Sequence, residues 1–351
     1  MREIVSEIER WRASGVRYAV ATVIATRRSS PRPVGSKLVV SETGEMAGSV
    51  SGGCVENEVY GCAREVLDGA APRLLTYGIS DDLALSVGLP CGGEIDVFVE
   101  EADDGLTARL AQALERHERG VLFTVVEGEP LGAELFVLED GERLGDGPAE
   151  LADHADEVLR AGRNRTLEVD GRRVFAEVFG PPPRLLVFGA VDTAEALCRA
   201  AKSVGWRTIV SDARGKFATA DRLPSADEIV VAWPDETLAR IEPDHATAVV
   251  VLTHDDRFDV PALTGALATD AFYVGALGSR RNQARRRELL LEAGVDEKAL
   301  DRISGPCGLD IGADTPAETA LSILAEILAV RARRGGGPLR EAPGRIHVEV
   351  G

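Results

Sequence analysis

The amino-acid sequence predicts an α/β protein in which an irregular α+β half precedes a Rossmann-like domain with a doubly wound parallel sheet. Three observations support this fold class. After residue 184, short continuous apolar runs alternate with amphipathic helical segments. Before residue 180, strand-like and helix-like segments follow one another less regularly. Between the halves stand Pro181, Pro182 and Pro183, which lack amide donors and cannot continue a helix or a central strand.

The proline run indicates a domain boundary. The chain has 351 residues, enough for two domains at roughly 150 residues each. We expect an N-terminal domain over residues 1–180, a Rossmann-like domain over residues 181–335 and a tail over residues 336–351. The hydrophobic share of 44% leaves enough apolar material for two cores.

The second half supplies the strands of the predicted parallel sheet. A helix is expected over about residues 193–204, and the last helix begins at Thr315-Pro316-Ala317-Glu318, a capping box with proline at the first helical position. The expected buried strands cover residues 185–188, 208–210, 228–232, 248–252 and 271–274.

The first half mixes strands and helices. Helices are expected over residues 54–67 and 106–117, and a turn at residues 43–45. The expected strands cover residues 18–25, 37–40, 94–99, 121–126, 135–138, 165–169 and 173–178.

The charge balance restricts the classes of partner. The 58 acidic residues outnumber the 40 basic ones, which gives a net charge of −18 at pH 7. Nucleic-acid binding by counterion release needs a basic surface, and so does docking on an anionic membrane leaflet, so the composition argues against both. No apolar run approaches the roughly 18 residues that span a bilayer. The N-terminus lacks the apolar core of a signal peptide, so we expect a cytoplasmic protein without stable membrane insertion.

The chain has five cysteines, and two of them adjoin glycine pairs. An odd number in a chain expected in the cytoplasm argues against a disulfide framework, and the absence of CxxC and HxxxH pairs argues against structural zinc. Gly52-Gly53-Cys54 leads into an expected helix, and Cys91-Gly92-Gly93 leads into an expected strand. We expect Cys62, Cys198 and Cys307 to be packed in the core.

Glycines allow a ligand to approach the backbone, and free amides at a helix start favour anions and lower the pKa of a thiol. A thiolate is a soft metal ligand and a nucleophile for sulfur chemistry. Cys54 and Cys91 are therefore expected to share a site for a soft metal or a sulfur-bearing ligand. The alternative is that each is a tight turn beside a buried, inert cysteine.

Two acid-free basic segments stand out in this acidic chain. Residues 27–37 hold four bases, among them Arg32 and Lys37, and residues 278–287 place Ser279 and Arg280 at the start of a helix. The guanidinium fork of arginine matches phosphate, and a helix N-terminus attracts anions. Both segments are candidate anion sites; the alternative is a solvated basic surface.

The turn after the first strand of the second half keeps little of the G-x-G-x-x-G dinucleotide fingerprint. Only Gly189 remains, and Asp192 is expected to cap the next helix with Glu195 in the capping-box position. A carboxylate would then stand where a pyrophosphate binds. Asp212 does end the second strand, where a ribose-binding acid is expected. We interpret the turn as structural, with NAD(P) binding as the alternative.

Two more loops follow the strands of the second half. Thr253-His254-Asp255-Asp256 comes directly after a buried strand, where ligands bind in open α/β sheets. Its histidine and carboxylates suit metal ligation or proton transfer; a set of helix-capping acids is the alternative. The loop of residues 305–314 is expected to face the same crevice, or else to be an ordinary connection.

Taken together, these segments resemble the XdhC/CoxI family of molybdenum-hydroxylase maturation factors. The resemblance covers most of the chain and is least specific over about residues 101–180. It rests on SSPRPVGSK, GSVSGGCVE and LPCGGEIDVFVE in the first half, and on VVVLTHDDRFDVPAL, YVGALGSRRNQARRR and GLDIGADTPAETALSILAEI in the second.

The resemblance implies an XdhC/CoxI-type N-terminal domain and binding of molybdenum cofactor, a pterin with a dithiolene and a phosphate. It implies an accessory factor, not an enzyme, that assists sulfuration of the cofactor, together with a cysteine desulfurase, and insertion of the cofactor into a client enzyme. The client would be a xanthine dehydrogenase or a CO dehydrogenase-type hydroxylase, and a homodimer is a further expectation. Cys54 and Cys91 become the candidate metal-contacting residues. The wider cofactor-binding set comprises Gly52, Gly53, Gly92, Gly93, Arg32, Lys37, His254, Ser279 and Arg280.

One departure from the family pattern concerns nucleotide binding. Many members carry a fuller glycine-rich turn with a histidine where this chain has GAVDTAE. An NAD(P)-dependent oxidoreductase that uses the Rossmann-like domain remains the alternative function. A structural adaptor whose client binding is indifferent to both cysteines is a third.

Overall fold

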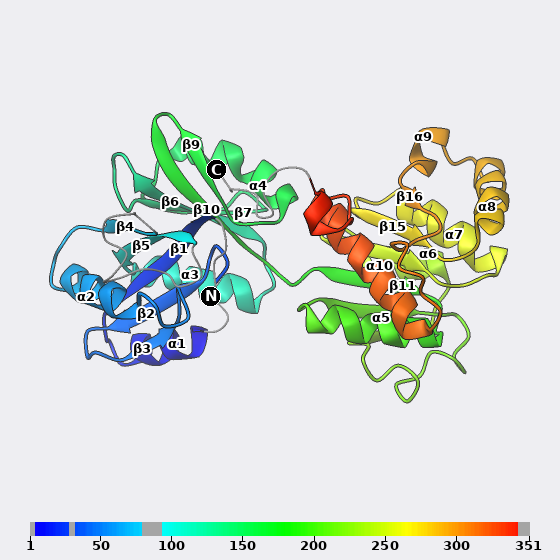
Figure 1. Ribbon diagram of the computed structural model, residues 1–351, viewed down its shortest axis with the longest axis horizontal. Helices are drawn as coiled ribbons and strands as arrows, with labels where there is room; N and C mark the ends of the chain where they lie inside the picture. Colours follow the sequence, from blue (N-terminus) through cyan, green and yellow to red (C-terminus); the bar gives the residue numbers. More distant parts are fainter. Residues whose placement is uncertain (1–3, 28–31, 79–92, 343–351) are drawn as a thin grey trace. The chain divides into compact units, whose positions relative to one another are not determined.

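The computed structural model describes residues 4–27, 32–78 and 93–342 and confirms the predicted fold class. The chain forms two compact units, and the boundary between them falls between Pro181 and Pro182. Figure 1 shows their helices and strands. Each unit is described by itself below.

The first sheet of unit 1 has five strands in the order β3-β2-β1-β5-β4. All its pairings are antiparallel, and β1 and β5 occupy its centre. The strands are β1 (Tyr18–Arg27), β2 (Lys37–Ser41), β3 (Met46–Gly48), β4 (Arg73–Tyr77) and β5 (Glu94–Glu101). Helix α2 (Glu56–Leu67) covers one face of this sheet through a buried apolar cluster, and α1 (Val5–Ala13) packs against the other.

The second sheet of unit 1 lies in the part of the sequence with the least specific motifs. Its five antiparallel strands follow the order β8-β7-β6-β10-β9. They are β6 (Gly120–Glu127), β7 (Glu134–Leu138), β8 (Arg143–Gly145), β9 (Arg165–Val169) and β10 (Arg172–Phe179). The turn η1 (Ala149–His154) and α4 (Ala155–Ala161) cover its outer face, and α3 (Asp104–Glu115) packs on its inner face. Ile24, Phe98, Val126 and Phe175 join the two sheets in one apolar cluster.

Unit 2 is the Rossmann-like domain. Its six-stranded sheet is parallel throughout, in the order β13-β12-β11-β14-β15-β16. The strands are β11 (Arg184–Phe188), β12 (Arg207–Ser211), β13 (Glu228–Val230), β14 (Thr247–Val251), β15 (Tyr273–Ala276) and β16 (Ile303–Ser304). The order reverses between β11 and β14, which makes this pair the topological switch point where ligands bind in such sheets.

Helices cover both faces of this sheet, as the alternation of apolar runs predicts. One buried cluster joins the sheet to α5 (Asp192–Ser203) and α10 (Pro316–Arg331). The other face carries α6 (Pro234–Ile241), α7 (Asp256–Leu267), α8 (Arg280–Glu292) and α9 (Glu297–Leu300). The short turn η2 (Leu339–Glu341) follows α10. The capping box of α10 forms as expected, because Thr315 and Glu318 exchange hydrogen bonds with each other's backbone amides.

Candidate functional site

The loop between β3 and α2 presents a free thiol and bare backbone. Cys54 is exposed and makes no disulfide. Gly52 and Gly53 precede it with φ of +78° and +114°, in the left-handed region that favours glycine. A Cβ placed on either glycine would meet no atom within 4 Å. A ligand can therefore approach the backbone of this loop closely.

The amides of this loop are not free to bind an anion, and that expectation is wrong. Most of them donate hydrogen bonds to a single carboxylate, that of Glu56 in the first turn of α2. It accepts hydrogen bonds from the Ser49 and Ser51 hydroxyls and from the amides of Val50, Ser51, Gly53 and Val55. The remaining amides, those of Gly52 and Cys54, donate to the Ser49 and Ser51 hydroxyls.

Burial of Glu56 raises its pKa, but the hydrogen bonds from Ser51 and Ser49 outweigh burial and lower the pKa to about 2. The loop therefore carries its own permanent anion in the place where an external one was expected. This role of Glu56 was missed from the sequence. Its signal was a glutamate placed three positions after Gly53, which resembles the second half of a capping box.

The second predicted cysteine motif is only partly described. Cys91 and Gly92 lie outside the described residues, whereas Gly93 is buried directly before β5. Three positions further, Asp96 is 1% exposed. Its carboxylate accepts hydrogen bonds from Arg27 at 3.0 and 3.2 Å and from Arg173 at 2.8 Å. Asp96 thereby joins the end of β1, the start of β5 and strand β10 of the other sheet.

The first basic segment does not form one surface anion site. Its Lys37 is buried, and its Nζ lies 2.8 Å from Glu177 Oε2. Arg27 pairs with Asp96 and with Glu94. Arg32, half-buried, also has an interaction partner. The acid-free appearance of this segment is a property of the linear sequence, since acids from other strands pair with Arg27 and Lys37.

The three cysteines predicted to be structural are indeed buried. Burial raises the pKa of the Cys62 thiol, and it raises those of Cys198 and Cys307 to about 12. Among the four cysteines in the described part of the chain, Cys54 is thus the one that solvent and ligands reach.

The switch point of unit 2 begins with Gly189, whose φ is +110°. A Cβ there would stand 2.8 Å from Cγ2 of Thr253, so the turn after β11 and the loop after β14 meet closely enough to require glycine. The predicted side-chain cap of α5 is absent, because Val191 occupies the N-cap position and Asp192 points to solvent, 88% exposed. Glu195, expected to complete the capping box, bonds instead to Ser225.

The predicted ribose-binding acid is already engaged. Asp212 is buried and accepts a hydrogen bond of 3.0 Å from the Ala190 amide. Its carboxylate also binds Arg214 Nε and a terminal guanidinium nitrogen at 2.9 and 2.7 Å. That guanidinium lies 4.6 Å from the Phe217 ring centroid. A ribose would have to displace Arg214 from Asp212, which weighs against ordinary dinucleotide binding.

His254 is exposed directly after β14. The two acids that follow it in the sequence already bind other groups. Asp255 caps α7 and pairs with Arg257, and Asp256 pairs with Arg285 of α8. Within the described ranges no group of three histidine, cysteine, aspartate or glutamate side chains is placed to hold a metal ion. For Asp255 and Asp256, helix capping and ion pairing are therefore the better interpretation than metal ligation.

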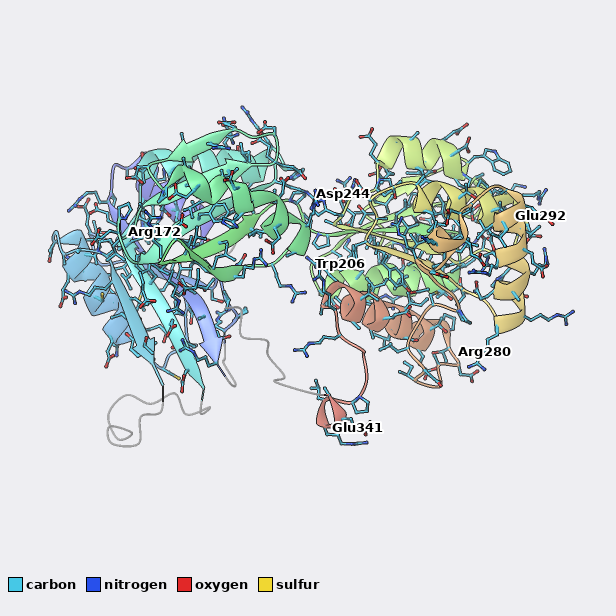
Figure 2. All side chains as sticks on the ribbon, turned by 90° about the horizontal axis from the view of Figure 1, so that it is seen from above. Arg172, Trp206, Asp244, Arg280, Glu292 and Glu341 are labelled. Carbon is cyan, nitrogen blue, oxygen red and sulfur yellow. The ribbon has the colours of Figure 1, made fainter. Side chains whose placement is uncertain are left out.

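The second basic segment differs from the first, because its first arginine, Arg280, is exposed to solvent at the start of a helix. Ser279 caps α8 by accepting a hydrogen bond from the Asn282 amide. Arg280 is exposed, and Figure 2 shows it at one end of α8 with Glu292 at the other. The first turn of α8 contains no acid. Cations at a helix N-terminus oppose the helix dipole, so this end of α8 favours an anionic partner.

The loop of residues 305–314 adjoins the same edge of the sheet. The Cys307 amide donates to the Ala276 carbonyl at the end of β15. The amide of Gly308 donates to Glu326 of α10 at 2.8 Å, and the Tyr273 hydroxyl donates to the same carboxylate oxygen at 2.5 Å. The structure thus brings the loops at Gly189, His254, Ser279 and Cys307 to the carboxyl edge of one sheet.

Comparison with known proteins assigns the family. The pattern of the XdhC Rossmann domain matches residues 185–327, and that of the XdhC and CoxI family matches residues 11–78. The chain belongs to the XdhC and CoxI family. This confirms the resemblance seen in the sequence motifs, and the Rossmann match falls on unit 2.

Two curated proteins align with this XdhC-family chain over most of its length. One, from Bacillus subtilis (strain 168), is named as a probable subunit of xanthine dehydrogenase and is 29% identical over 90% of this chain and 93% of its own length. The other, molybdenum cofactor insertion chaperone PaoD from Escherichia coli (strain K12), is 29% identical over 91% of this chain and 85% of its own length.

A solved structure shares the XdhC-family fold. It is described as a xanthine dehydrogenase from Bacillus halodurans and superposes with a TM-score of 0.68 at 26% identity. The match covers 97% of this chain and 98% of the other. In the part of the XdhC-family chain that the structure describes, no helix is long and apolar enough to cross a bilayer.

Proposed function

We propose that this protein is a molybdenum-cofactor chaperone that assists insertion of the cofactor into a xanthine dehydrogenase-type hydroxylase. The similarity to PaoD over nearly the whole of both chains carries the proposal. The cofactor is the molecule that this protein would pass on to its client, and the described residues suit transient binding of it. They offer one accessible thiol instead of a complete set of metal ligands.

Cys54 is the proposed contact to the metal or its terminal sulfur, and Cys91 is proposed to share that task. Gly52 and Gly53 leave room for the bulk of the cofactor, since no atom stands within 4 Å of where their side chains would begin. Gly92 and Gly93 are proposed to play the corresponding part beside Cys91. The Glu56 carboxylate fixes the shape of the Cys54 loop through its hydrogen bonds.

Ser279 and Arg280 are the proposed partners of the cofactor's phosphate, with His254 as a further polar contact and Arg32 as a basic one. The uncompensated first turn of α8 supports the phosphate assignment. Lys37 is left out of this set, because its ammonium is buried against Glu177. Sulfuration with a cysteine desulfurase, a CO dehydrogenase-type client and a homodimeric state are finer parts of the same proposal.

The proposal is tested by cofactor retention. The full chain is produced in a host that makes molybdenum cofactor, and molybdenum content and pterin fluorescence are measured after purification. We expect Cys54→Ala and Cys91→Ala to lower retention at least tenfold and to reduce maturation of a co-expressed client. Asn57→Ala, an exposed change three residues from Cys54, serves as the matched control and is expected to retain the cofactor. Full retention and full client maturation by both cysteine variants would refute the proposal.

The rival function is an NAD(P)-dependent oxidoreductase, favoured by the Rossmann strand order of unit 2. The pairing of Asp212 with Arg214 opposes it. Calorimetric titration with NAD(H) and NADP(H) separates the two functions, and we expect no binding heat at millimolar ligand.

A further inference from the structure

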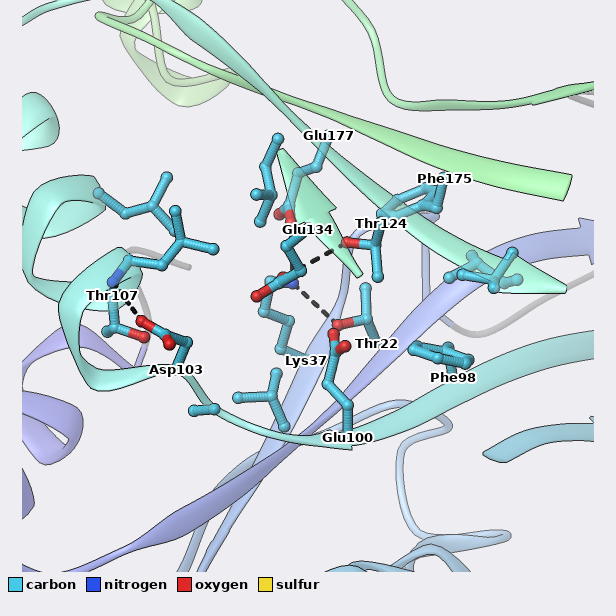
Figure 3. A pocket seen from close by; sticks show the side chains of 17 residues that line it. Thr22, Lys37, Phe98, Glu100, Asp103, Thr107, Thr124, Glu134, Phe175 and Glu177 are labelled. Atoms are coloured by element: carbon cyan, nitrogen blue, oxygen red, sulfur yellow. Dashed lines mark hydrogen bonds and ion pairs between the residues drawn. The ribbon is translucent and has the colours of Figure 1, made fainter. Parts of the chain in front are cut away.

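A small cavity lies between the inner faces of the two sheets of unit 1 (Figure 3). Its volume is about 40 Å³, enough for one or a few water molecules. Phe98 and Phe175 close one side of it (Figure 3). Further apolar side chains, among them Leu106, Leu110 and Leu122, line it together with threonine and ionisable side chains. This cavity lies in unit 1 and does not involve Cys54 or the other proposed cofactor contacts.

Ionisable side chains reach the cavity from five different elements. Strands β1 and β6 contribute the hydroxyls of Thr22 and Thr124 but no charge. The ionisable groups are Lys37 of β2, Glu100 of β5, Asp103 at the start of α3, Glu134 of β7 and Glu177 of β10. Of these cavity-lining groups, Lys37 alone is a cation.

The charge of Lys37 is already compensated. Its Nζ lies 2.8 Å from Glu177 Oε2 and donates a hydrogen bond of 2.8 Å to Thr22 Oγ1. The Lys37 and Glu177 side chains are 6% and 7% exposed, so this pair is shielded from solvent. Asp103 is engaged in capping α3, where it accepts from the Leu106 amide at 2.6 Å. Glu100 and Glu134 therefore face the cavity without a cation of their own.

Glu100 and Glu134 are half-buried between the two sheets, where a carboxylate without a cation is costly to keep ionised, so they retain protons instead. Burial raises the pKa of Glu134 to about 7, although the charge of Lys37 opposes the rise. Burial, together with the neighbouring charge of Glu134, raises the pKa of Glu100 well above its ordinary value. Thr124 gives Glu134 only a long hydrogen bond of 3.4 Å.

We propose that the interface between the two sheets of unit 1 is a proton-operated latch, which is closed while Glu100 and Glu134 hold protons and loosens when both ionise. In the ionised state, four carboxylates from β5, α3, β7 and β10 face one ammonium across the cavity. Their mutual repulsion draws water into the cavity and weakens the contact between the sheets.

The latch also reaches the Cys54 loop. The carbonyl of Lys37 accepts a hydrogen bond of 2.9 Å from the Ser49 amide, which fixes the start of that loop. A shift of β2 relative to the second sheet therefore moves the root of the loop. The latch is a property of the protein without cofactor. The experiments below therefore test it independently of the proposed function.

Unfolding of the full chain as a function of pH tests the latch. Glutamine imitates a protonated glutamate, so Glu134→Gln is expected to match the wild type at about pH 4 and to exceed its stability at pH 8. The ratio of the two folding constants should change about tenfold per pH unit between pH 5 and 7, then level off. Glu139→Gln, an exposed change in the turn after β7, is the control and should follow the wild type at every pH.

Parallel pH profiles for the wild type and Glu134→Gln would overturn the latch. Glu100→Gln provides a second variant, with the same expected direction. Hydrogen–deuterium exchange of the wild type, corrected for the intrinsic rate, gives a readout that needs no variant. Strands β2, β5, β7 and β10 should lose protection at least threefold between pH 6 and 8.5 relative to strands β11 and β14 of unit 2. Equal changes in both units would overturn the proposal as well.

Discussion

The Arg286 guanidinium donates a hydrogen bond of 2.6 Å to the Asp259 carboxylate, and the two side chains are 6% and 2% exposed. The other oxygen of Asp259 accepts from the Thr253 hydroxyl. Asp259 of α7 thus ties the loop that carries His254 to α8, the helix that begins with Arg280. The buried pair holds the two candidate ligand-contacting segments of unit 2 in one arrangement.

Asp259→Ala should be strongly destabilising, because it leaves the buried charge of Arg286 without its counter-ion. The expected loss is about 3–5 kcal/mol. Asp256→Ala removes the carboxylate of a more exposed ion pair, that with Arg285, and is the matched control, with an expected loss of about 0–1 kcal/mol. In a Trp11→Phe background the remaining tryptophans lie in unit 2, so fluorescence-detected urea unfolding reports on that unit alone. Similar losses for both variants would contradict the prediction.

Glu56→Ala should destabilise unit 1 by about 1–3 kcal/mol at pH 7, because several loop amides lose their acceptor. The pKa of Glu56 is about 2 in the folded protein, below its ordinary value. Its contribution is therefore complete above about pH 4.5 and is lost as the pH falls toward 2. The difference between wild type and variant, followed by Trp11 fluorescence with the other tryptophans replaced by phenylalanine, should shrink in that range. Glu58→Ala, exposed on the same helical turn, should cost little at any pH.

Thiol labelling should distinguish Cys54 from the buried cysteines. In a Cys91→Ala background, one equivalent of iodoacetamide should react quickly with the folded protein at pH 8. Cys62, Cys198 and Cys307 should react at least a hundredfold more slowly, because they are buried and burial raises their pKa. Peptide mass spectrometry assigns the labelled site. Rapid modification of Cys198 or Cys307 in the folded state would be inconsistent with the structure.

Gly189→Ala should cost unit 2 roughly 2–4 kcal/mol, from its positive φ and from the 2.8 Å approach to Thr253. Gly294→Ala is the control, since Gly294 also has a positive φ of +88° but a Cβ there meets nothing within 4 Å. That variant should cost only about 1 kcal/mol. The difference between the two isolates the steric contribution, and equal losses in urea unfolding would exclude it.

The sequence was most informative about unit 2. Continuous apolar runs such as that of residues 248–252 can only be buried strands or buried helices, and the intervening helices left a parallel sheet as the consistent arrangement. The five predicted strands lie within about two residues of those observed. Strand β16 has only two residues, too few to leave a periodic pattern.

The candidate site was less predictable, because charges were judged from linear neighbours alone. Lys37 belongs to an acid-free segment in sequence, yet in the fold it pairs with Glu177, which is 140 residues away in the chain. Asp192 obeys the capping pattern, but Asp212 lies close to the same turn and binds the Ala190 amide instead. Such partners come from tertiary pairing of distant strands, which no local spacing encodes.

The contacts of the Asp96 carboxylate determine how long an N-terminal fragment of this protein must be to keep its ion pairs. The family pattern over residues 11–78 stops before β5, which is the central partner of β1. A fragment with those limits would expose the edge of β1 and leave Arg27 without its counter-ion. Extending the fragment through residue 101 would restore Asp96 but would omit Arg173 of β10. Deletion or domain-swap experiments should therefore cut the chain at Pro181, and treat everything before it as a single module.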